Sequence, residues 1–382
     1  MLELEPSSLD EAAEAMTRAA REQLRVAFVG GGTELGVGGW REGADAVIRT
    51  GRMARILEYA PADMVVVAEA GVTLAQLQAA TRARGQMLAL DPPLPERATV
   101  GGLVATGAFG PRRARYGAVR DLIIGVTLVR ADGAVAHGGG KVVKNVAGFD
   151  LPKIACGSFG TLGLVATATF RLHPLPEVTA ASVAEGVAVE AIPGLLASAR
   201  EAQLEPSSVV ALRSSSGAFD VAVWFEGFAK GVEQQVARFV DRTGARRVDD
   251  DGALRRRHDA ARTGGPLRVK VGALPSRIAA VRATLAPLLA VLDGAEVAWY
   301  ATLGIGFVAG APRADWREAV AASRARLVAE GGWLVVEAAP DAPGPDLDPW
   351  GPPPPAFEIM RQLKQRFDPE HRLNRGRFVG GL

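Results

Sequence analysis

The fold is decided by the stretch VAFVGGGT, residues 26–33, in which an apolar run leads directly into three glycines and a threonine. Four apolar residues followed by a turn signal predict a short buried strand that ends at Val29. Glycines have no Cβ atom, so a phosphate group can approach their main-chain N–H groups closely. The stretch therefore predicts a strand that ends in an anion-binding loop. A tight turn without a ligand is the alternative.

Two more glycine-rich segments follow in the same half of the chain. TVGGLVATGAFG, residues 99–110, predicts a small-residue helix that begins near Gly101-Gly102, and a helix N-terminus favours negative charge. GSFGTLG, residues 157–163, is the third segment. Two sites of this kind suit a pyrophosphate, the centre of a dinucleotide cofactor. The spacings match neither the Rossmann fingerprint nor a P-loop, so the sequence does not favour either of these nucleotide-binding folds.

Hydrophobic patterns around these loops predict an α+β fold. Strands are expected in the first half at 26–29, 46–49, 64–68, 122–130, 134–137 and 161–172, with helices from Ser8 to Arg21 and from Thr73 to Arg84. Residues 267–338 show a β-α-β-β-α-β order, the split-βαβ pattern of ferredoxin-like domains. We expect domains at 1–175 and 176–338, a Pro-rich linker at 339–355, and a C-terminal helix and tail at 356–382 that return to the first domain.

Composition narrows the class of protein. The 382 residues suit two domains, and a net charge of +2 gives no reason to expect nucleic acid as a partner. A single cysteine, Cys156, cannot form an intrachain disulfide or a Cys-rich iron–sulfur site. The acidic N-terminus does not resemble a signal peptide, and no apolar run reaches the ~18 residues of a membrane helix. These features predict a soluble, cytoplasmic protein without direct membrane insertion, in which any membrane association comes through partner subunits.

Several motifs together resemble a known family. KNVAGFDL (144–151) and GSFGTLGLV (157–165), with the loops at 30–33, 91–93, 99–102 and 115–121, resemble the signature of the vanillyl-alcohol-oxidase-like, PCMH-type FAD-binding family. Within it, GPRR (110–113) and the tail with LNRGR (373–377) are similar to the FAD-binding E subunits of bacterial glycolate oxidases.

This resemblance implies a fold, a cofactor and a site. The fold would be an FAD-binding domain of two α+β subdomains plus a C-terminal ferredoxin-like cap. FAD would be bound non-covalently, because no histidine lies at 99–117, where some relatives attach the flavin. The cofactor-binding residues implied are Gly30, Gly31, Gly32, Thr33, Pro93, Thr99, Val100, Gly101, Gly102, Thr106, Gly107, Gly110, Gly117, Gly163, Leu164 and Val165.

The resemblance also implies a function within a complex. A catalytic flavoprotein (D-like) subunit would oxidise glycolate to glyoxylate, and an iron–sulfur (F-like) subunit would take the electrons. Two alternatives stay open. The chain could be a self-sufficient FAD-dependent 2-hydroxyacid or alcohol oxidoreductase, or a non-catalytic assembly subunit that binds flavin weakly.

Departures from the family pattern bear on catalysis. Catalytic relatives carry a histidine-rich metal motif, whereas His137, His173, His258 and His371 are scattered here, so no metal site is expected and the catalytic residues stay unassigned. Phe159 stands where the family has a glutamate. Cys156 is expected to be a small buried thiol.

The sequence contains two basic clusters. Arg112, Arg113 and Arg115 form either a solvated surface or a contact to phosphate or to an acidic partner. The run from Arg255 to His258 is expected on an exposed helix face.

Overall fold

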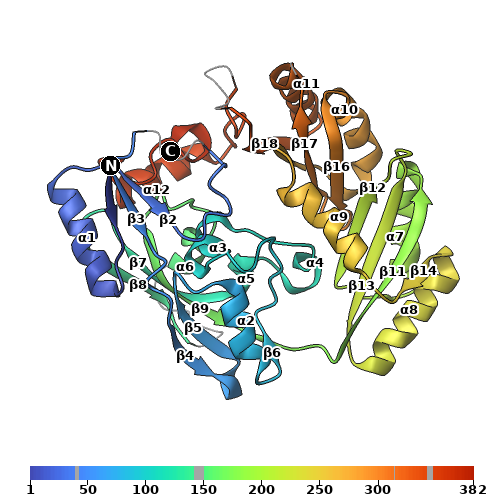
Figure 1. Cartoon of the computed structure of the whole chain (residues 1–382), viewed down its shortest axis with the longest axis horizontal. Helices are drawn as coiled ribbons and strands as arrows, with labels where there is room; N and C mark the ends of the chain where they lie inside the picture. The colour runs from blue at the N-terminus through green and yellow to red at the C-terminus, as the bar shows by residue number, and fades with distance from the viewer. Residues whose placement is uncertain (39–42, 142–149, 314, 342–346) are drawn as a thin grey trace. The chain divides into compact units, whose positions relative to one another are not determined.

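The computed structural model describes residues 1–38, 43–141, 150–313, 315–341 and 347–382 (Figure 1). These residues form two compact units. Unit 1 comprises Met1–Gly110, Gly117–Leu175 and Pro352–Leu382, and unit 2 comprises Pro111–Tyr116 and Pro176–Gly351. The grouping of the short segment Pro111–Tyr116 with unit 2 was not anticipated from the sequence. Residues 144–149 of the family motif and part of the Pro-rich stretch lie outside the described residues.

A three-stranded parallel sheet opens unit 1, in the order β1-β3-β2. Its strands are β1 (Leu2–Leu4), β2 (Val26–Val29) and β3 (Ala46–Arg49), and helix α1 (Leu9–Arg21) connects β1 to β2. Ser8 caps α1 by accepting a hydrogen bond from the Glu11 N–H at 3.1 Å. The buried face of α1 packs with Met53 and Leu164, so this sheet shares a core with the rest of the unit.

An antiparallel five-stranded sheet, in the order β4-β5-β9-β7-β8, forms the second subdomain of unit 1. Its strands are β4 (Ile56–Ala60), β5 (Val65–Glu69), β7 (Ile123–Val129), β8 (Val135–Gly139) and β9 (Leu164–Arg171). A separate short pair is formed by β6 (Gln86–Met87) and β10 (His173–Pro174).

Short helices complete unit 1. They are α2 (Leu74–Arg82), α3 (Val100–Thr106), α5 (Val119–Leu122), α6 (Leu151–Ala155) and α12 (Phe357–Phe367), with single 3-10 turns at Pro61–Asp63 and Val379–Gly381. Thr73 and Gln76 form a capping box at the start of α2, at 3.2 and 2.9 Å. Helix α3 begins at the second glycine segment and packs on β9.

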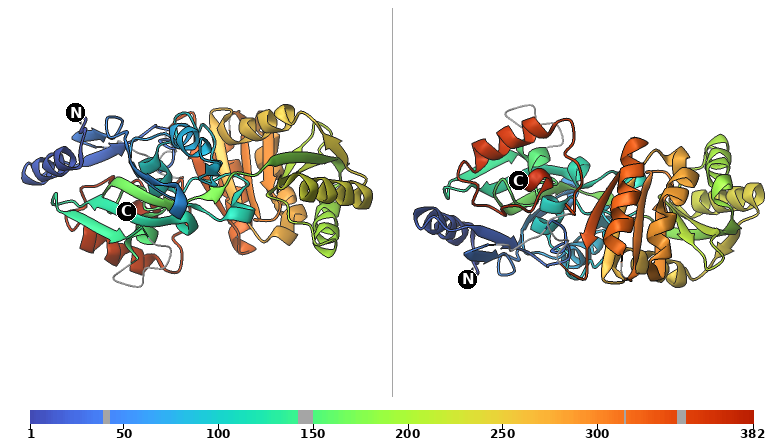
Figure 2. Two further views of the ribbon diagram at one scale, coloured as in Figure 1. Left: turned by 90° about the horizontal axis from the view of Figure 1, so that it is seen from below. Right: turned by 90° about the horizontal axis from the view of Figure 1, so that it is seen from above.

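The C-terminal tail joins the parallel sheet of unit 1. Leu373 forms a parallel bridge with Val26, with the Val26 N–H donating to the Arg372 carbonyl and the Asn374 N–H donating to the Val26 carbonyl, each at 2.8 Å. Figure 2 shows the red C-terminal segment in the same unit as the blue N-terminal elements. After this bridge the tail turns, and the Arg377 N–H donates to the Asn374 carbonyl at 3.1 Å.

Unit 2 is built on one eight-stranded sheet, in the order β14-β11-β13-β12-β16-β17-β15-β18. This order contains two split-βαβ repeats side by side, joined through the antiparallel pair β12–β16. The first repeat is β11 (Val178–Val187), α7 (Ile192–Glu201), β12 (Ser208–Arg213), β13 (Phe219–Gly227), α8 (Ala229–Thr243) and β14 (Arg246–Val248). The second is β15 (Leu267–Gly272), α10 (Ile278–Ala290), β16 (Leu292–Tyr300), β17 (Ile305–Pro312), α11 (Trp316–Ala329) and β18 (Trp333–Ala338).

The ferredoxin-like pattern expected for 267–338 is confirmed, but the first repeat was not recognised as one. Its strand β11 is made largely of small residues, VTAASVAEGV, which give little hydrophobic periodicity. Helices α7, α8, α10 and α11 share a core with one face of the sheet. Helix α9 (Gly252–Thr263) connects the repeats and packs on the opposite face, where His258 contacts Tyr300. Helix α4 (Arg113–Tyr116) also belongs to unit 2.

Candidate functional site

A pocket opens in unit 1 where β2 ends. Concave sites of this kind are where small molecules and cofactors usually bind. Eleven of the residues expected from the sequence line the pocket: Gly30, Gly31, Gly32, Thr33, Thr99, Gly101, Gly102, Thr106, Gly163, Leu164 and Val165. The structure therefore brings the three glycine segments together around one space.

Five of the expected residues do not line this pocket: Pro93, Val100, Gly107, Gly110 and Gly117. Val100 is fully buried, and Gly107 ends α3 with a left-handed φ of 64°. A Cβ on Gly110 would lie 1.9 Å from the Asp91 carbonyl oxygen, and Gly117 has a φ of 86° beside Asp121. These residues have local structural reasons for their identity, and their roles toward a cofactor stay predictions.

Packing between the loops explains why three of the lining positions are glycine. A Cβ on Gly31 would lie 1.5 Å from the Arg97 carbonyl oxygen, and one on Gly30 would lie 2.3 Å from Thr99 Oγ1. A Cβ on Gly101 would lie 2.7 Å from the Ala70 Cβ. Gly102 differs, because its Cβ would meet only Thr99 Oγ1, at 3.2 Å. A side chain at Gly102 would therefore extend into the pocket rather than into the protein.

The two glycine loops offer different groups to a ligand. The Gly101 N–H already donates to the Ala70 carbonyl at 2.8 Å, so Gly101 contributes its lack of a side chain rather than a donor. By contrast, the N–H groups of Gly30, Gly32 and Thr33 have no hydrogen-bond partner within the part of the chain that the structure describes. Main-chain donors beside glycines are suited to a phosphate. The residues at 30–33 therefore fit the diphosphate of a dinucleotide.

Ten lining residues were not expected from the sequence: Phe28, Val29, Glu34, Leu35, Thr50, Ala105, Phe159, Gly160, Asn374 and Arg377. Asn374 and Arg377 come from the C-terminal tail, more than 340 residues from the glycine loop. The resemblance of LNRGR to a family tail was the only sequence signal that could have pointed to these two residues. That resemblance did not assign either residue a role in the site.

Phe159 forms an aromatic part of the pocket wall. Its main chain is left-handed, with a φ of 53°, and its ring stacks on Phe378 of the tail at 5.4 Å. The Arg377 guanidinium lies over the same Phe159 ring, 5.6 Å from the ring centre. The phenylalanine that replaces the family glutamate is thus part of a contact between the 157–163 loop and the tail.

None of the four histidines is among the described residues that line the pocket, and each is on a different element. His137 is on β8, His173 is on β10, His258 is on α9 in unit 2, and His371 is in the tail. Burial lowers the pKa of His258, whose Nε2 lies 2.6 Å from the Tyr300 hydroxyl. His258 is therefore buried, contrary to the exposed position expected for the Arg255–His258 run. Across the described ranges, no three His, Cys, Asp or Glu side chains group as a metal site would require.

Cys156 is partly buried at the end of α6, and it lines a different cavity from the pocket described above. Burial raises the pKa of its thiol to about 12. A thiol with this pKa stays protonated at neutral pH and is a poor nucleophile. This position and chemistry agree with the expected small buried thiol.

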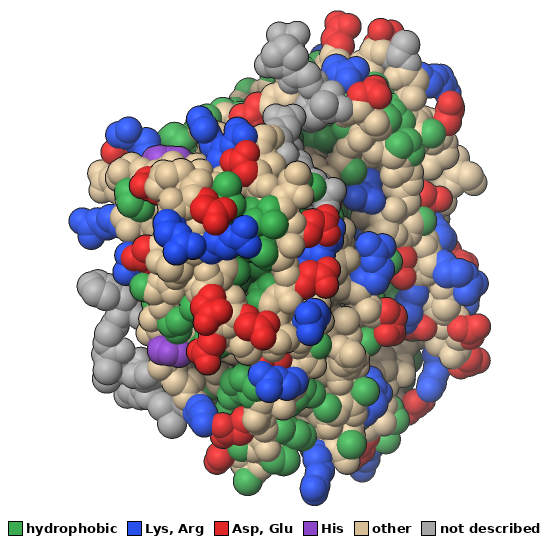
Figure 3. Space-filling view, turned by 60° about the vertical axis from the view of Figure 1, so that its left-hand side comes forward, with side chains coloured by type: hydrophobic (Ala, Val, Ile, Leu, Met, Phe, Trp, Pro, Cys, Tyr) green, Lys and Arg blue, Asp and Glu red, His purple; other side chains and the backbone are tan. Residues whose placement is uncertain are grey.

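The cluster at Arg112–Arg115 is not a free basic surface. Within unit 2, the Arg112 Nε donates to Glu226 at 3.0 Å, and the Tyr116 hydroxyl donates to the same carboxylate at 3.2 Å. Glu226 is 4% exposed, so Arg112 compensates a buried charge. A charge reversal at Arg112 would therefore test the stability of unit 2. It would not test whether the cluster contacts an acidic partner. Figure 3 shows basic and acidic side chains interspersed on the face drawn.

The fold and the pocket together define a PCMH-type FAD-binding domain. Residues 2–139 match the family described as FAD binding domain, so the chain carries such a domain and FAD is its cofactor. The structure is similar to that of alkyldihydroxyacetonephosphate synthase, with a TM-score of 0.72 at 17% identity over 97% of this chain and 75% of that one. At this identity the similarity establishes the fold alone.

Curated relatives match the chain over less than half of its length. The chain is 36% identical over 170 residues to glycolate oxidase subunit GlcE of Escherichia coli, covering 44% of this chain and 46% of that protein. It is 37% identical over 173 residues to D-lactate dehydrogenase of Archaeoglobus fulgidus, covering 45% and 38%. It is 32% identical over 172 residues to glycolate oxidase subunit GlcD of Bacillus subtilis, covering 45% and 37%. The matches thus span less than half the length of these relatives.

Helices that cross a bilayer need about 20 consecutive, mostly apolar residues. No helix in the described part of the chain is both long enough and apolar enough to cross a bilayer.

Proposed function

We propose that the chain is an FAD-binding subunit of a glycolate oxidase (dehydrogenase) complex that converts glycolate to glyoxylate. A D-like flavoprotein subunit would carry the substrate site, and an F-like iron–sulfur subunit would take the electrons. The observation that carries the proposal is the similarity to GlcE, at 36% identity over 170 residues. This subunit would contribute a second flavin without a complete substrate site of its own.

The composition of the pocket supports a flavin site without a base for the substrate. Among the described residues that line it, only Glu34 and Arg377 are charged, and no histidine, lysine or tyrosine is present. Oxidation of a 2-hydroxyacid requires a group that removes a proton from the substrate. Apart from Glu34, the described lining residues include no such group.

The residues of the chain would bind and orient the cofactor. The N–H groups of Gly30, Gly32 and Thr33 would bind phosphate oxygens, while Thr99 Oγ1 accepts from the N–H groups of both Gly31 and Gly102 at 3.4 Å and so links the two loops. Phe159 would exclude water from one wall. When bound, FAD supplies the ability to accept a hydride equivalent and to release the electrons singly or in pairs.

We expect the FAD to be non-covalent, because the described residues that line the pocket include neither a histidine nor Cys156. Acid precipitation of the purified chain should release all of the yellow flavin into the supernatant. The measurement is the flavin absorbance of supernatant and pellet. Colour that stays with the precipitated protein after washing would show a covalent link.

The second expectation is that the isolated chain shows little or no glycolate oxidation even when it is loaded with FAD. The test is turnover of glycolate with an artificial electron acceptor, compared with a complex purified from the native cell. We expect activity only in a preparation that also contains a second flavoprotein and an iron–sulfur protein.

The other outcomes separate the alternatives. Turnover by the FAD-loaded chain alone, at ordinary enzyme rates, would make it a self-sufficient enzyme acting on a 2-hydroxyacid or alcohol, as the similarity to D-lactate dehydrogenase allows. A colourless chain that still assembles with the two partners would be an assembly subunit. Migration of the chain alone in a native extract would overturn the complex.

A further inference from the structure

The C-terminal tail contributes two side chains to the FAD pocket. Asn374 and Arg377 are both buried, at 6% and 5% exposure, and both line the pocket beside the glycine loop. They reach it because Leu373 bridges to Val26 and the tail then turns, with the Arg377 N–H donating to the Asn374 carbonyl at 3.1 Å. The Arg377 side chain lies at the glycine loop, where its Nη2 donates to the Glu34 carbonyl.

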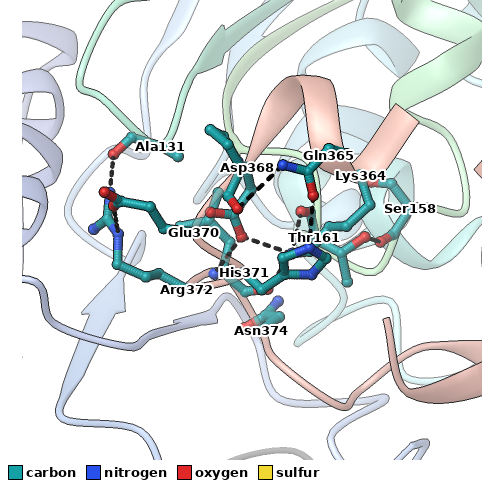
Figure 4. A network of polar contacts seen from close by, with 12 residues as sticks. Ala131, Ser158, Thr161, Lys364, Gln365, Asp368, Glu370, His371, Arg372 and Asn374 are labelled. Carbon is teal, nitrogen blue, oxygen red and sulfur yellow. Dashed lines mark hydrogen bonds and ion pairs between the residues drawn. The ribbon is translucent and has the colours of Figure 1, made fainter. Parts of the chain in front are cut away.

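A buried network holds the tail in this position (Figure 4). The Lys364 ammonium group on α12 donates to the Thr161 carbonyl at 2.8 Å, to the Leu373 carbonyl at 2.9 Å and to Asp368 Oδ2 at 2.7 Å. Asp368 Oδ2 also accepts from the Leu373 N–H at 2.8 Å. The network thus joins α12, the 157–163 loop and the tail at one point inside unit 1.

Asn374 connects the tail to both sides of the pocket. Its Oδ1 accepts from the Phe28 N–H at 3.0 Å, and its Nδ2 donates to the Phe159 carbonyl at 2.6 Å. An amide can donate and accept at the same time, which is what these two main-chain groups require. Asn374 therefore links β2, the strand before the glycine loop, to the 157–163 loop through two hydrogen bonds.

Arg377 brings a positive charge to the glycine loop. Its Nη2 donates to the Glu34 carbonyl at 3.0 Å, and the guanidinium lies over the Phe159 ring. Among the described lining residues it is the only cation. The Glu34 carboxylate partly offsets that charge, yet the available N–H groups at 30–33 carry no formal charge to meet the two negative charges of a diphosphate.

We propose that Arg377 is a binding residue for the FAD diphosphate, and that Asn374 and the Lys364–Asp368 network are positioning residues that hold it beside the glycine loop. The cofactor site is then assembled from the two ends of the chain. A guanidinium can donate to phosphate oxygens while it keeps its contact with the Glu34 carbonyl, because it has five N–H donors. The proposal rests on FAD binding alone and not on membership of a complex.

The experiment compares FAD binding to the full-length apoprotein and to Arg377→Gln, Arg377→Lys and Arg375→Gln variants. Arg375 is exposed in the same tail and serves as the matched control. The FAD dissociation constant is measured by quenching of flavin fluorescence at several salt concentrations, and thermal unfolding of each apoprotein reports on folding.

A diphosphate contact predicts a specific pattern. Arg377→Gln should weaken FAD binding roughly 10- to 100-fold and make it less dependent on salt, because one charged contact to phosphate is lost. Arg377→Lys should recover part of the affinity and the salt dependence, and Arg375→Gln should change neither. If Arg377→Gln does not fold, the salt dependence of FAD binding by Arg377→Lys decides whether Arg377 contacts the diphosphate. Unchanged affinity in Arg377→Gln, or equal loss in the glutamine and lysine variants with an unchanged salt dependence, would overturn the proposal.

Discussion

Replacing Gly102 with leucine should abolish FAD binding while unit 1 still folds. A Cβ at Gly102 meets only Thr99 Oγ1 at 3.2 Å, so the leucine side chain would occupy the pocket. Leucine is also a better helix former than glycine by roughly 0.8 kcal/mol, which favours α3. The measurement is flavin absorbance of the purified chain together with its thermal unfolding.

A matched control lies in unit 2. Gly231 is the third residue of α8, as Gly102 is of α3, and its Cβ would have no neighbour within 4 Å. Gly231→Leu should therefore bind FAD like the unmodified chain. A Gly102→Leu protein that retains stoichiometric FAD would show that the cofactor does not occupy this pocket.

Replacing Asp368 with alanine should produce the largest loss of stability, about 3–5 kcal/mol in the free energy of unfolding. The side chains of Lys364 and Asp368 are 1% and 0% exposed, so the variant would leave an ammonium group buried with only carbonyl partners. The tail that carries Asn374 would also lose an anchor, so FAD binding should weaken. Chemical denaturation of the apoprotein measures the first effect.

The control is an exposed ion pair on the same helix. Glu358 and Arg361 of α12 are 59% and 63% exposed and lie three residues apart. Glu358→Ala should cost less than about 1 kcal/mol, because exposed pairs contribute little. If Asp368→Ala costs no more than Glu358→Ala, the buried network does not anchor the tail.

Much of the local structure could be predicted from the sequence. The strand at 26–29, the capped helices after Ser8 and Thr73, and the second split-βαβ repeat all follow from short-range signals such as apolar periodicity, hydroxyl caps and turn residues. The first split-βαβ repeat was not predicted, because β11 is rich in small residues and helix α9 separates the two repeats. The ion pair between Arg112 and Glu226 could not be predicted, because the two residues are 114 positions apart in the sequence.

The sequence by itself determined that glycine loops follow a strand and begin a helix, and that they resemble those of an FAD-binding family. Glycine acts locally, since the absence of a Cβ is a property of one residue. Only the tertiary structure decided which N–H groups can donate to a ligand. The Gly101 N–H donates to the Ala70 carbonyl, whereas those of Gly30, Gly32 and Thr33 have no partner among the described residues. The tertiary structure also placed Asn374 and Arg377 in the pocket, since a parallel bridge between Val26 and Leu373 depends on packing across nearly the whole chain rather than on any local pattern.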